Sequence, residues 1–268
     1  MNTFNINRFW LTLKWDFVSN KRTWLWILIT MTAVLFLLFE FNMLSVRNLP
    51  TFMLDAKIND MAITSWIVFS FFMIIGGGSS ICANIKKKEA RVAFFTLPAS
   101  NLEKFITRYI LVTVNYAVMF AVSLIVADFL RYVFCMIAGP DVHGSVALRF
   151  FEILSTDSFQ MQKTHMDVDY FYLLNISVMI LVLWLHSLYI LGGTFFRRNS
   201  GLFTTLILIA TAFVFAFIHF TPSINMSTDT AGYISIITVF GLLTVLDYWA
   251  AFQLFKRIQV INNKWINV

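Results

Sequence analysis

Charged residues and cysteines are both scarce in this sequence. Asp, Glu, Lys and Arg make up 13% of the 268 residues, whereas they make up about 25% of an ordinary soluble domain. The two cysteines, Cys82 and Cys135, lie in or beside apolar segments, where a thiol behaves as a small hydrophobic group. These shortages exclude an ordinary soluble domain, a disulfide framework and a cysteine-based metal site.

Motifs that carry catalysis are missing as well. The glycine-rich stretch at residues 76–80 lies inside an apolar run, and no Lys-Ser or Lys-Thr follows it, so it is not a phosphate-binding loop. Its small residues instead favour the close approach of two helices in lipid. The sequence contains no His-Glu-x-x-His and no Gly-x-Ser-x-Gly pattern. We therefore predict no catalytic residue, no bound metal and no cofactor, and we do not expect an enzyme.

Apolar residues, by contrast, make up 59% of the chain. They form six stretches, each bounded by charge and each close to the roughly 20 residues of helix that cross a bilayer. The stretches cover residues 24–41, 62–85, 105–127, 170–195, 202–220 and 231–255. Continuous apolar runs differ from the alternating pattern of a barrel strand, and helices satisfy their own backbone groups in lipid. We predict an all-α integral membrane protein with six transmembrane helices in a single domain, residues 1–268.

Most of the 20 Lys and Arg residues fall on one side of this arrangement. If the N-terminus is cytoplasmic and the six helices alternate in direction, the basic residues on the outer side are Arg47, Lys57, Arg131, Arg149 and Lys163. Because cytoplasmic loops carry the Lys and Arg excess, both termini are predicted to be cytoplasmic. No nucleic-acid-binding fold accompanies the net charge of +6, and attraction to anionic lipid headgroups accounts for the basic residues.

Residues 5–20 have the pattern of an amphipathic helix rather than of a span. The residues at helical spacing on the apolar side are Ile6, Phe9, Trp10, Leu13 and Phe17. The residues on the polar side are Arg8, Thr12, Asp16 and Ser19. We predict a helix that lies in the membrane interface. It is either a surface anchor or a docking element that transmits the movement of a cytoplasmic partner into the first span.

The loop between the second and third spans, residues 86–104, is the most informative polar segment. A run of three lysines, residues 86–88, opens it, and an apolar middle follows. Pro98 disfavours a helical conformation at the residue before it, so a helix is predicted to end there. Ser100 and Glu103 have the Ser-x-x-Glu spacing of a capping box, which starts the next helix. The pattern predicts a short helix on the cytoplasmic surface, a tight turn, and then the third span.

This loop resembles the corresponding loop of ABC-2-type transporter permeases, in which an acidic residue opens a coupling helix and a Thr/Leu-Pro-x-Ser turn leads into the third span. The matching residues are Glu89, Thr96, Leu97, Pro98, Ser100 and Lys104. Residues 192–199, which close the fourth span, also resemble small members of this group. Two features depart from the family. Ala-Arg-Val-Ala follows Glu89 in place of Gly-Thr, and the long outer segment lies between spans three and four instead of five and six.

The resemblance implies the membrane-spanning permease subunit of an ABC-type exporter, in the inner (cytoplasmic) membrane. A separate cytoplasmic ATPase would energise it, and the subunit would form a homodimer or pair with another permease. The predicted coupling residues are Glu89, Leu97 and Pro98, which match the family's loop, and Phe94 and Phe95, which belong to the apolar middle of the predicted helix. Phe94 and Phe95 would anchor the loop helix in a groove of the ATPase, and Glu89 would orient it near the positive N-terminal end. The alternative is a non-transporting membrane scaffold or sensor of the same architecture.

Ionisable residues inside the predicted spans are the remaining candidates for a site. His186 and Asp247 lie at similar depth in spans four and six, where a charge costs at least about 2.5–3.5 kcal/mol. We predict a hydrogen-bonded pair that joins the two helices; a path for substrate or protons, or no contact, are the alternatives. Asp128 and Arg131, three residues apart, predict a local ion pair. Residues 147–154 predict a short helix on the outer surface.

Overall fold

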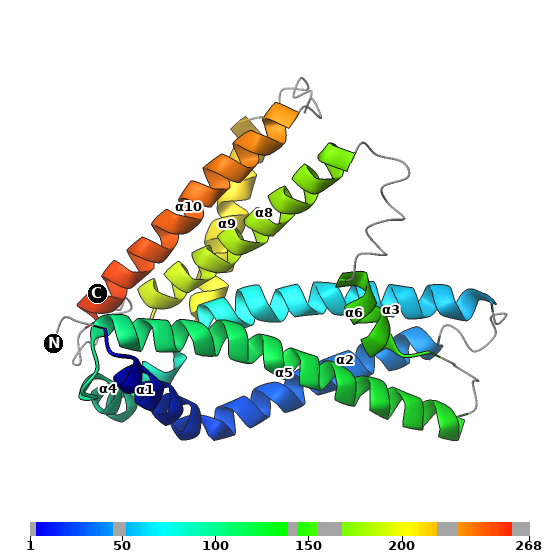
Figure 1. Cartoon of the computed structure of the whole chain (residues 1–268), viewed down its shortest axis with the longest axis horizontal. Coiled ribbons are helices and arrows are strands. Elements are labelled where there is room, and N and C mark those ends of the chain that lie inside the picture. Colours follow the sequence, from blue (N-terminus) through cyan, green and yellow to red (C-terminus); the bar gives the residue numbers. More distant parts are fainter. Residues whose placement is uncertain (1–3, 45–51, 139–143, 155–167, 219–229, 259–268) are drawn as a thin grey trace. The chain divides into compact units, whose positions relative to one another are not determined.

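The computed structural model describes residues 4–44, 52–138, 144–154, 168–218 and 230–258 (Figure 1). Within these ranges the regular structure is helical and no strand is present. In chain order the helices are α1 (Ile6–Ser19), α2 (Lys21–Leu44), α3 (Phe52–Phe71), the π-helical η1 (Phe72–Gly78), the 3₁₀ turn η2 (Ala83–Ile85), α4 (Lys88–Phe95), α5 (Asn101–Ala138), α6 (Val146–Leu154), α8 (Val168–Phe195), α9 (Ser200–Ile218) and α10 (Thr230–Arg257).

Five helical segments of the described chain are long and apolar enough to cross a membrane. They are Lys21–Met43, Ala56–Ile85, Asn101–Ile137, Tyr172–Phe195 and Gly232–Arg257. The apolar helix Ser200–Phe213 is shorter than these segments. The all-helical class and the membrane-spanning character predicted from the sequence are therefore confirmed, and the sixth span stays a prediction.

Two spans differ from the helices expected from hydropathy. The third span, expected over residues 105–127, belongs to the 38-residue helix α5, which continues through Asp128 and Arg131. The charges of these two residues do not end the helix, because they neutralise each other across one turn at 2.8 Å, as predicted. The second span, expected as one helix over 62–85, instead changes from α3 into η1 at Phe72 and ends in η2.

Contacts within the chain divide it into two compact units, and each is described by itself. The first unit contains Met1–Ser19, Met73–Thr113 and Asp167–Val268, and the second contains Asn20–Phe72 and Val114–Met166. The prediction of one domain over residues 1–268 stays a prediction.

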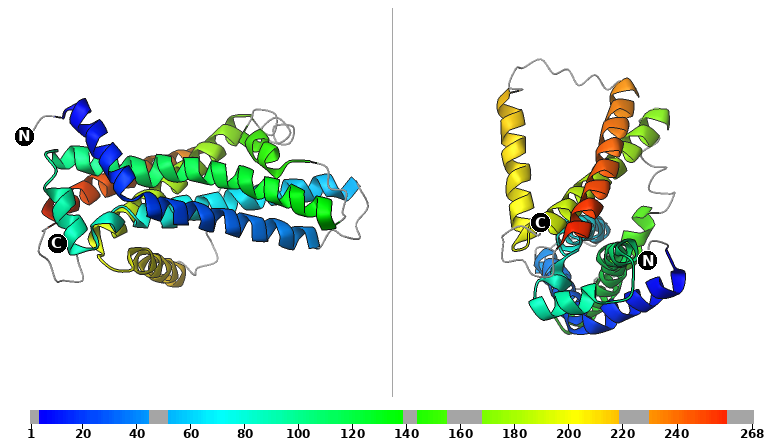
Figure 2. Two further views of the ribbon diagram at one scale, coloured as in Figure 1. Left: turned by 90° about the horizontal axis from the view of Figure 1, so that it is seen from below. Right: turned by 90° about the vertical axis from the view of Figure 1, so that its left-hand side faces the viewer.

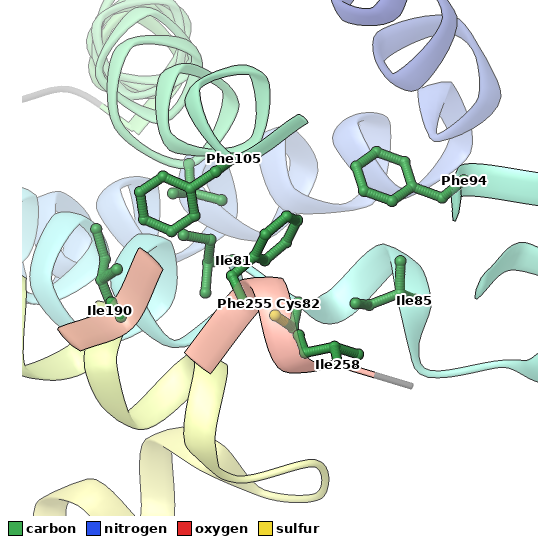
Figure 3. Packing of buried hydrophobic residues seen from close by; sticks show 10 residues of the cluster. Ile81, Cys82, Ile85, Phe94, Phe105, Ile190, Phe255 and Ile258 are labelled. Carbon is green, nitrogen blue, oxygen red and sulfur yellow. The ribbon is translucent and has the colours of Figure 1, made fainter. Parts of the chain in front are cut away.

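In the first unit, α8 and α10 lie side by side and run in the same direction, and α9 leads from the end of α8 back toward the start of α10 (Figures 1 and 2). The lower ends of α8 and α10 meet α4, α5 and the end of the second span in one hydrophobic cluster (Figure 3). Its buried members are Ile81, Cys82, Ile85, Phe94, Phe105, Val112, Ile190, Ala251, Phe255 and Ile258. This cluster fixes the position of α4.

Helix α1 turns its polar side toward the rest of the first unit. Thr12 and Asp16 are buried, whereas Ile6, Trp10 and Phe17 are exposed. Three of the five residues on the predicted apolar side face outward, but Phe9 of that side is buried, and Ser19 of the predicted polar side is exposed. The position of α1 in the membrane interface stays a prediction. Both α1 and α4 lie beside the first turns of α5 (Figure 2).

The second unit packs α2, α3, α6 and the later part of α5 through aromatic rings. Helix α6 confirms the short helix expected at residues 147–154, and its Phe150 stacks on Trp66 of α3 with ring centroids 4.4 Å apart. Phe120 of α5 lies 5.8 Å from Phe150 and 5.0 Å from Phe69. Offset and tilted ring pairs of this kind add to the gain from burial.

Candidate functional site

Helix α4 is the short helix predicted between the second and third spans. It begins after Lys87, whose backbone is extended, and has Glu89 in its first turn, where the helix dipole favours a negative charge. It ends at Phe95, and the N–H of Thr96 donates to the carbonyl of Val92 at 3.0 Å. The end lies three residues before Pro98, so the predicted stop is confirmed.

The predicted capping box at the start of α5 is also confirmed. The N–H of Ser100 donates to Glu103 Oε2 at 2.8 Å, and the N–H of Glu103 donates to Ser100 Oγ at 3.2 Å. The fully buried Glu103 carboxylate also accepts from the Asn5 N–H at 2.7 Å and from Arg8 Nη2 at 3.0 Å. One carboxylate thus satisfies donors at the start of α5 and fastens the first turn of α1 there.

Basic residues near α4 bind carbonyl groups at helix ends. Lys104 Nζ donates to the Phe95 carbonyl at 2.9 Å, and Arg91 Nε donates to the Ile85 carbonyl at 3.0 Å. Carbonyl groups in the last turn of a helix have no hydrogen-bond donor within the helix, and here the two basic side chains donate to them. Burial, and next the charge of Arg197, lower the pKa of the Arg91 guanidinium below its ordinary value.

Arg108 makes the most extensive of these contacts. Its Nη1 forms an ion pair with Asp16 Oδ2 of α1 at 3.0 Å, and both side chains are almost wholly buried. Its Nε and Nη2 donate to the carbonyls of Ile81 and Ser80 at 2.7 and 2.9 Å. Asn84 Nδ2 donates to Asp16 Oδ1 at 3.1 Å. Arg108 therefore joins α1, α5 and the irregular end of the second span.

The sequence reasoning missed this arrangement. It assigned Arg91, Lys104 and Arg108 to lipid headgroups and Asp16 to the polar side of a surface helix. The assignment of the three basic residues was wrong, because their side chains are buried within the protein. Asp16 does lie on the polar side of α1, but it is buried there instead of facing water. The spacing of Arg8, Thr12, Asp16 and Ser19 was the available signal, since a polar stripe on an interfacial helix can face protein as well as water.

The five predicted coupling residues divide between the surface and the core. Glu89 and Pro98 are exposed, and Phe95 and Leu97 are half-buried. Phe94 is completely buried, and its ring centroid lies 6.3 Å from that of Trp15 and 6.5 Å from that of Phe255. The expected role of Phe94 as a partner's anchor does not fit this position, because its ring fills the chain's own core.

The two predicted polar residues of the spans each find a different partner. His186 Nδ1 lies 3.0 Å from the Tyr248 hydroxyl, and Ser187 Oγ donates to Asp247 Oδ2 at 3.0 Å. The direct pair of His186 with Asp247 is replaced by two adjacent contacts between α8 and α10. Helix rotation explains the difference, because neighbouring residues differ by 100° around a helix axis. The contacts still join the two helices, as expected.

The glycines of the second span form a close contact with α8. A Cβ at Gly78 would lie 2.7 Å from Tyr189 Cβ, and a Cβ at Gly193 would lie 2.9 Å from the Gly78 carbonyl oxygen. The predicted role of residues 76–80 in close helix packing is confirmed at Gly78. The described residues contain no group of three His, Cys, Asp or Glu side chains placed to hold a metal ion.

Comparison of the chain with protein-family models, with curated proteins and with solved structures finds no match. The resemblance to ABC-2-type permeases therefore stays a prediction from the residues of the loop.

Proposed function

We propose that the chain is the membrane-spanning permease subunit of an ABC-type exporter of the ABC-2 class, energised by a separate cytoplasmic ATPase. The observation that carries the proposal is the construction of α4. One side of the helix is fixed in the core by Phe94, and the other leaves Glu89, Val92 and Ala93 exposed. A surface helix of this kind has a free face for a partner and a rigid connection behind it.

The connection runs from α4 into the membrane-spanning helices. Besides its contacts with Trp15 and Phe255, the Phe94 ring touches Phe95, whose centroid lies 6.1 Å from that of Phe255. Phe105 of α5 lies 5.4 Å from Phe255. Because packed cores deform little, a displacement of α4 by the ATPase would shift the adjoining ends of α5 and α10.

The free face of α4 differs from the one expected from the sequence. Val92, 38% exposed, replaces Phe94 as the apolar contact, with Glu89 on the same surface. The exposed lysines at residues 86–88 adjoin it. This composition suits an apolar groove with an acidic rim on the ATPase, since binding energy concentrates in a few desolvated contacts and charge complementarity directs the encounter.

Six spans with both termini cytoplasmic form part of the proposal. Helices α8 and α10 run in the same direction, and α9, which lies between them in the chain, runs in the opposite direction (Figure 1). The 19 residues of α9 extend about 28 Å, close to the roughly 30 Å of a bilayer core. The apolar surface of α10, exposed at Val245 and Trp249, is available for lipid or for the second permease of a dimer in the inner membrane.

Cysteine labelling in sealed vesicles tests this topology, and the buried native Cys82 and Cys135 give little background. Single cysteines at Lys87, Arg198 and Lys256, all exposed, should react from the cytoplasmic side, and one at Leu148 from the outer side. If Lys256 and Arg198 react from opposite sides, α9 does not span. If Lys87 reacts from outside, the orientation and the coupling role of α4 both fail.

Co-purification of an ATP-binding subunit from native membranes tests the function. Val92→Glu should weaken that complex by at least about ten-fold, the effect of losing one interface hot spot, and should leave membrane insertion intact. Leu148→Glu is the matched control, because Leu148 is an exposed apolar residue on a different short helix, α6. Absence of an ATP-binding subunit from the wild-type complex, or an unchanged complex with Val92→Glu, would instead favour the scaffold or sensor.

A further inference from the structure

A groove of about 620 Å³ lies between α1 and the turn that follows α4. Its lining residues are Arg8, Leu11, Thr12, Lys14, Trp15, Val18, Ser19, Leu97 and Pro98. Small-molecule sites typically measure about 300–1,000 Å³, so the groove has the size of a ligand site. Its apolar floor includes two residues that are largely exposed, Leu11 and Val18. Covering exposed apolar side chains with an apolar molecule removes them from water, which lowers the free energy.

Among the residues that the structure describes, the charged ones that line the groove are Arg8 and Lys14, and both are basic. Arg8 is paired with Glu103, whereas Lys14 is exposed and forms no ion pair with the described part of the chain. Among ligands that cover the apolar floor, one with a negative group beside Lys14 should therefore bind most tightly.

The groove is also close in sequence to a membrane-spanning segment. It follows α1 to Ser19, and the membrane-spanning segment starts two residues later at Lys21. Helix α1 presents Ile6 and Trp10 outward, as a helix in the lipid interface does. An acyl chain can reach this position from the bilayer while its phosphate stays at the surface.

We infer that this groove binds one anionic phospholipid, with the acyl chain against Leu11, Trp15 and Val18 and the phosphate beside Lys14. The bound lipid completes the contact between α1 and the Leu97–Pro98 turn. This site depends on the membrane-spanning character of the chain and is independent of coupling to an ATPase.

Fluorescence quenching by brominated lipids tests the site in the full chain, reconstituted in nanodiscs of neutral phosphatidylcholine. An equal minor fraction of lipid with dibrominated chains is added as phosphatidylglycerol or as phosphatidylcholine. The quenching of Trp15 is obtained by subtracting the fluorescence lost in Trp15→Phe from the fluorescence lost in the wild type. We expect brominated phosphatidylglycerol to occupy the position beside Trp15 about five-fold more than brominated phosphatidylcholine, the preference that one basic residue at a membrane surface supplies.

Two controls separate this site from general attraction of anionic lipid to a basic protein. Trp10, on the outward side of the same helix, should be quenched equally by the two lipids in the corresponding Trp10→Phe difference. Lys14→Gln, at an exposed position that folding does not require, should remove the preference at Trp15, and Lys87→Gln should keep it. Equal quenching of Trp15 by both lipids, or a preference that survives Lys14→Gln, would overturn the inference. Protection of Trp15 from both lipids would overturn it as well, because lipid would then not enter the groove.

Discussion

The ion pair between Arg108 and Asp16 gives the sharpest test of the structure. Its two side chains are 2% and 0% exposed, and its atoms are 3.0 Å apart. Removal of one partner from a buried pair leaves the other charge uncompensated, which costs about 3–5 kcal/mol. We therefore predict that Asp16→Ala lowers the free energy of unfolding by this amount and releases α1 from α5.

A second pair in the same chain provides the control. Arg149 and Glu152 of α6 are 2.9 Å apart, but their side chains are 51% and 57% exposed. An exposed pair at this spacing contributes only about 0.2–0.5 kcal/mol. Arg149→Ala should therefore have a small effect, although the distance in the pair is nearly the same.

The measurement is unfolding of the purified chain in mixed micelles with increasing detergent denaturant, followed by circular dichroism. The double variant Asp16→Ala/Arg108→Met removes both charges and should recover much of the loss, because no buried charge is left unpaired. Proteolysis within α1 should accelerate in Asp16→Ala alone. If Asp16→Ala costs no more than Arg149→Ala, the buried pair does not exist and α1 is not fastened as described.

Two further predictions concern the first unit. Gly78→Ala should lower the free energy of unfolding by about 1–3 kcal/mol, because its Cβ would lie 2.7 Å from a side chain of α8. Gly241→Ala has open space around the new Cβ and should raise the free energy of unfolding by about 0.5–1 kcal/mol in the same assay. In double-mutant cycles of thermal stability in detergent, His186→Ala and Tyr248→Phe should couple by at least about 0.5 kcal/mol, whereas His186→Ala and Asp247→Asn should couple less; the reverse order would restore the pair first expected from the sequence.

The sequence was sufficient to predict interactions between residues that are close together in the chain. Ser100 and Glu103 form their capping box, and Asp128 and Arg131 form their ion pair, because each pair is three residues apart on one helix and needs no tertiary structure. The spans follow from hydropathy for the same reason. The ends of the spans do not follow from hydropathy alone. The charge of Asp128 suggests that the third span ends before it, but the ion pair with Arg131 neutralises that charge and the helix continues.

The long-range contacts were beyond such reasoning. Asp16 and Arg108 are 92 residues apart, and nothing in their local sequence specifies that they meet. Phe94 was expected to face a partner because it is an apolar residue on a surface loop. The position of Phe255, which covers it, depends on how the end of α10 packs on α4. The choice of Tyr248 rather than Asp247 as the partner of His186 likewise depends on helix rotation, which hydropathy does not determine.

In the sequence analysis the basic residues supported two arguments, one for the orientation of the chain in the membrane and one for attraction to lipid headgroups. The burial of Arg91, Lys104 and Arg108 affects only the second. These residues still lie at the helix ends that are predicted to be cytoplasmic, so the excess of basic residues still supports the predicted orientation. They are not available to lipid or to a partner, because their donors are used on carbonyls and on Asp16. The cations left for recognition on that side therefore include Lys14 in the groove and the lysines at residues 86–88 beside α4. The proposed lipid binding and the proposed partner binding thus involve different residues, and Lys14→Gln and Val92→Glu should affect them separately.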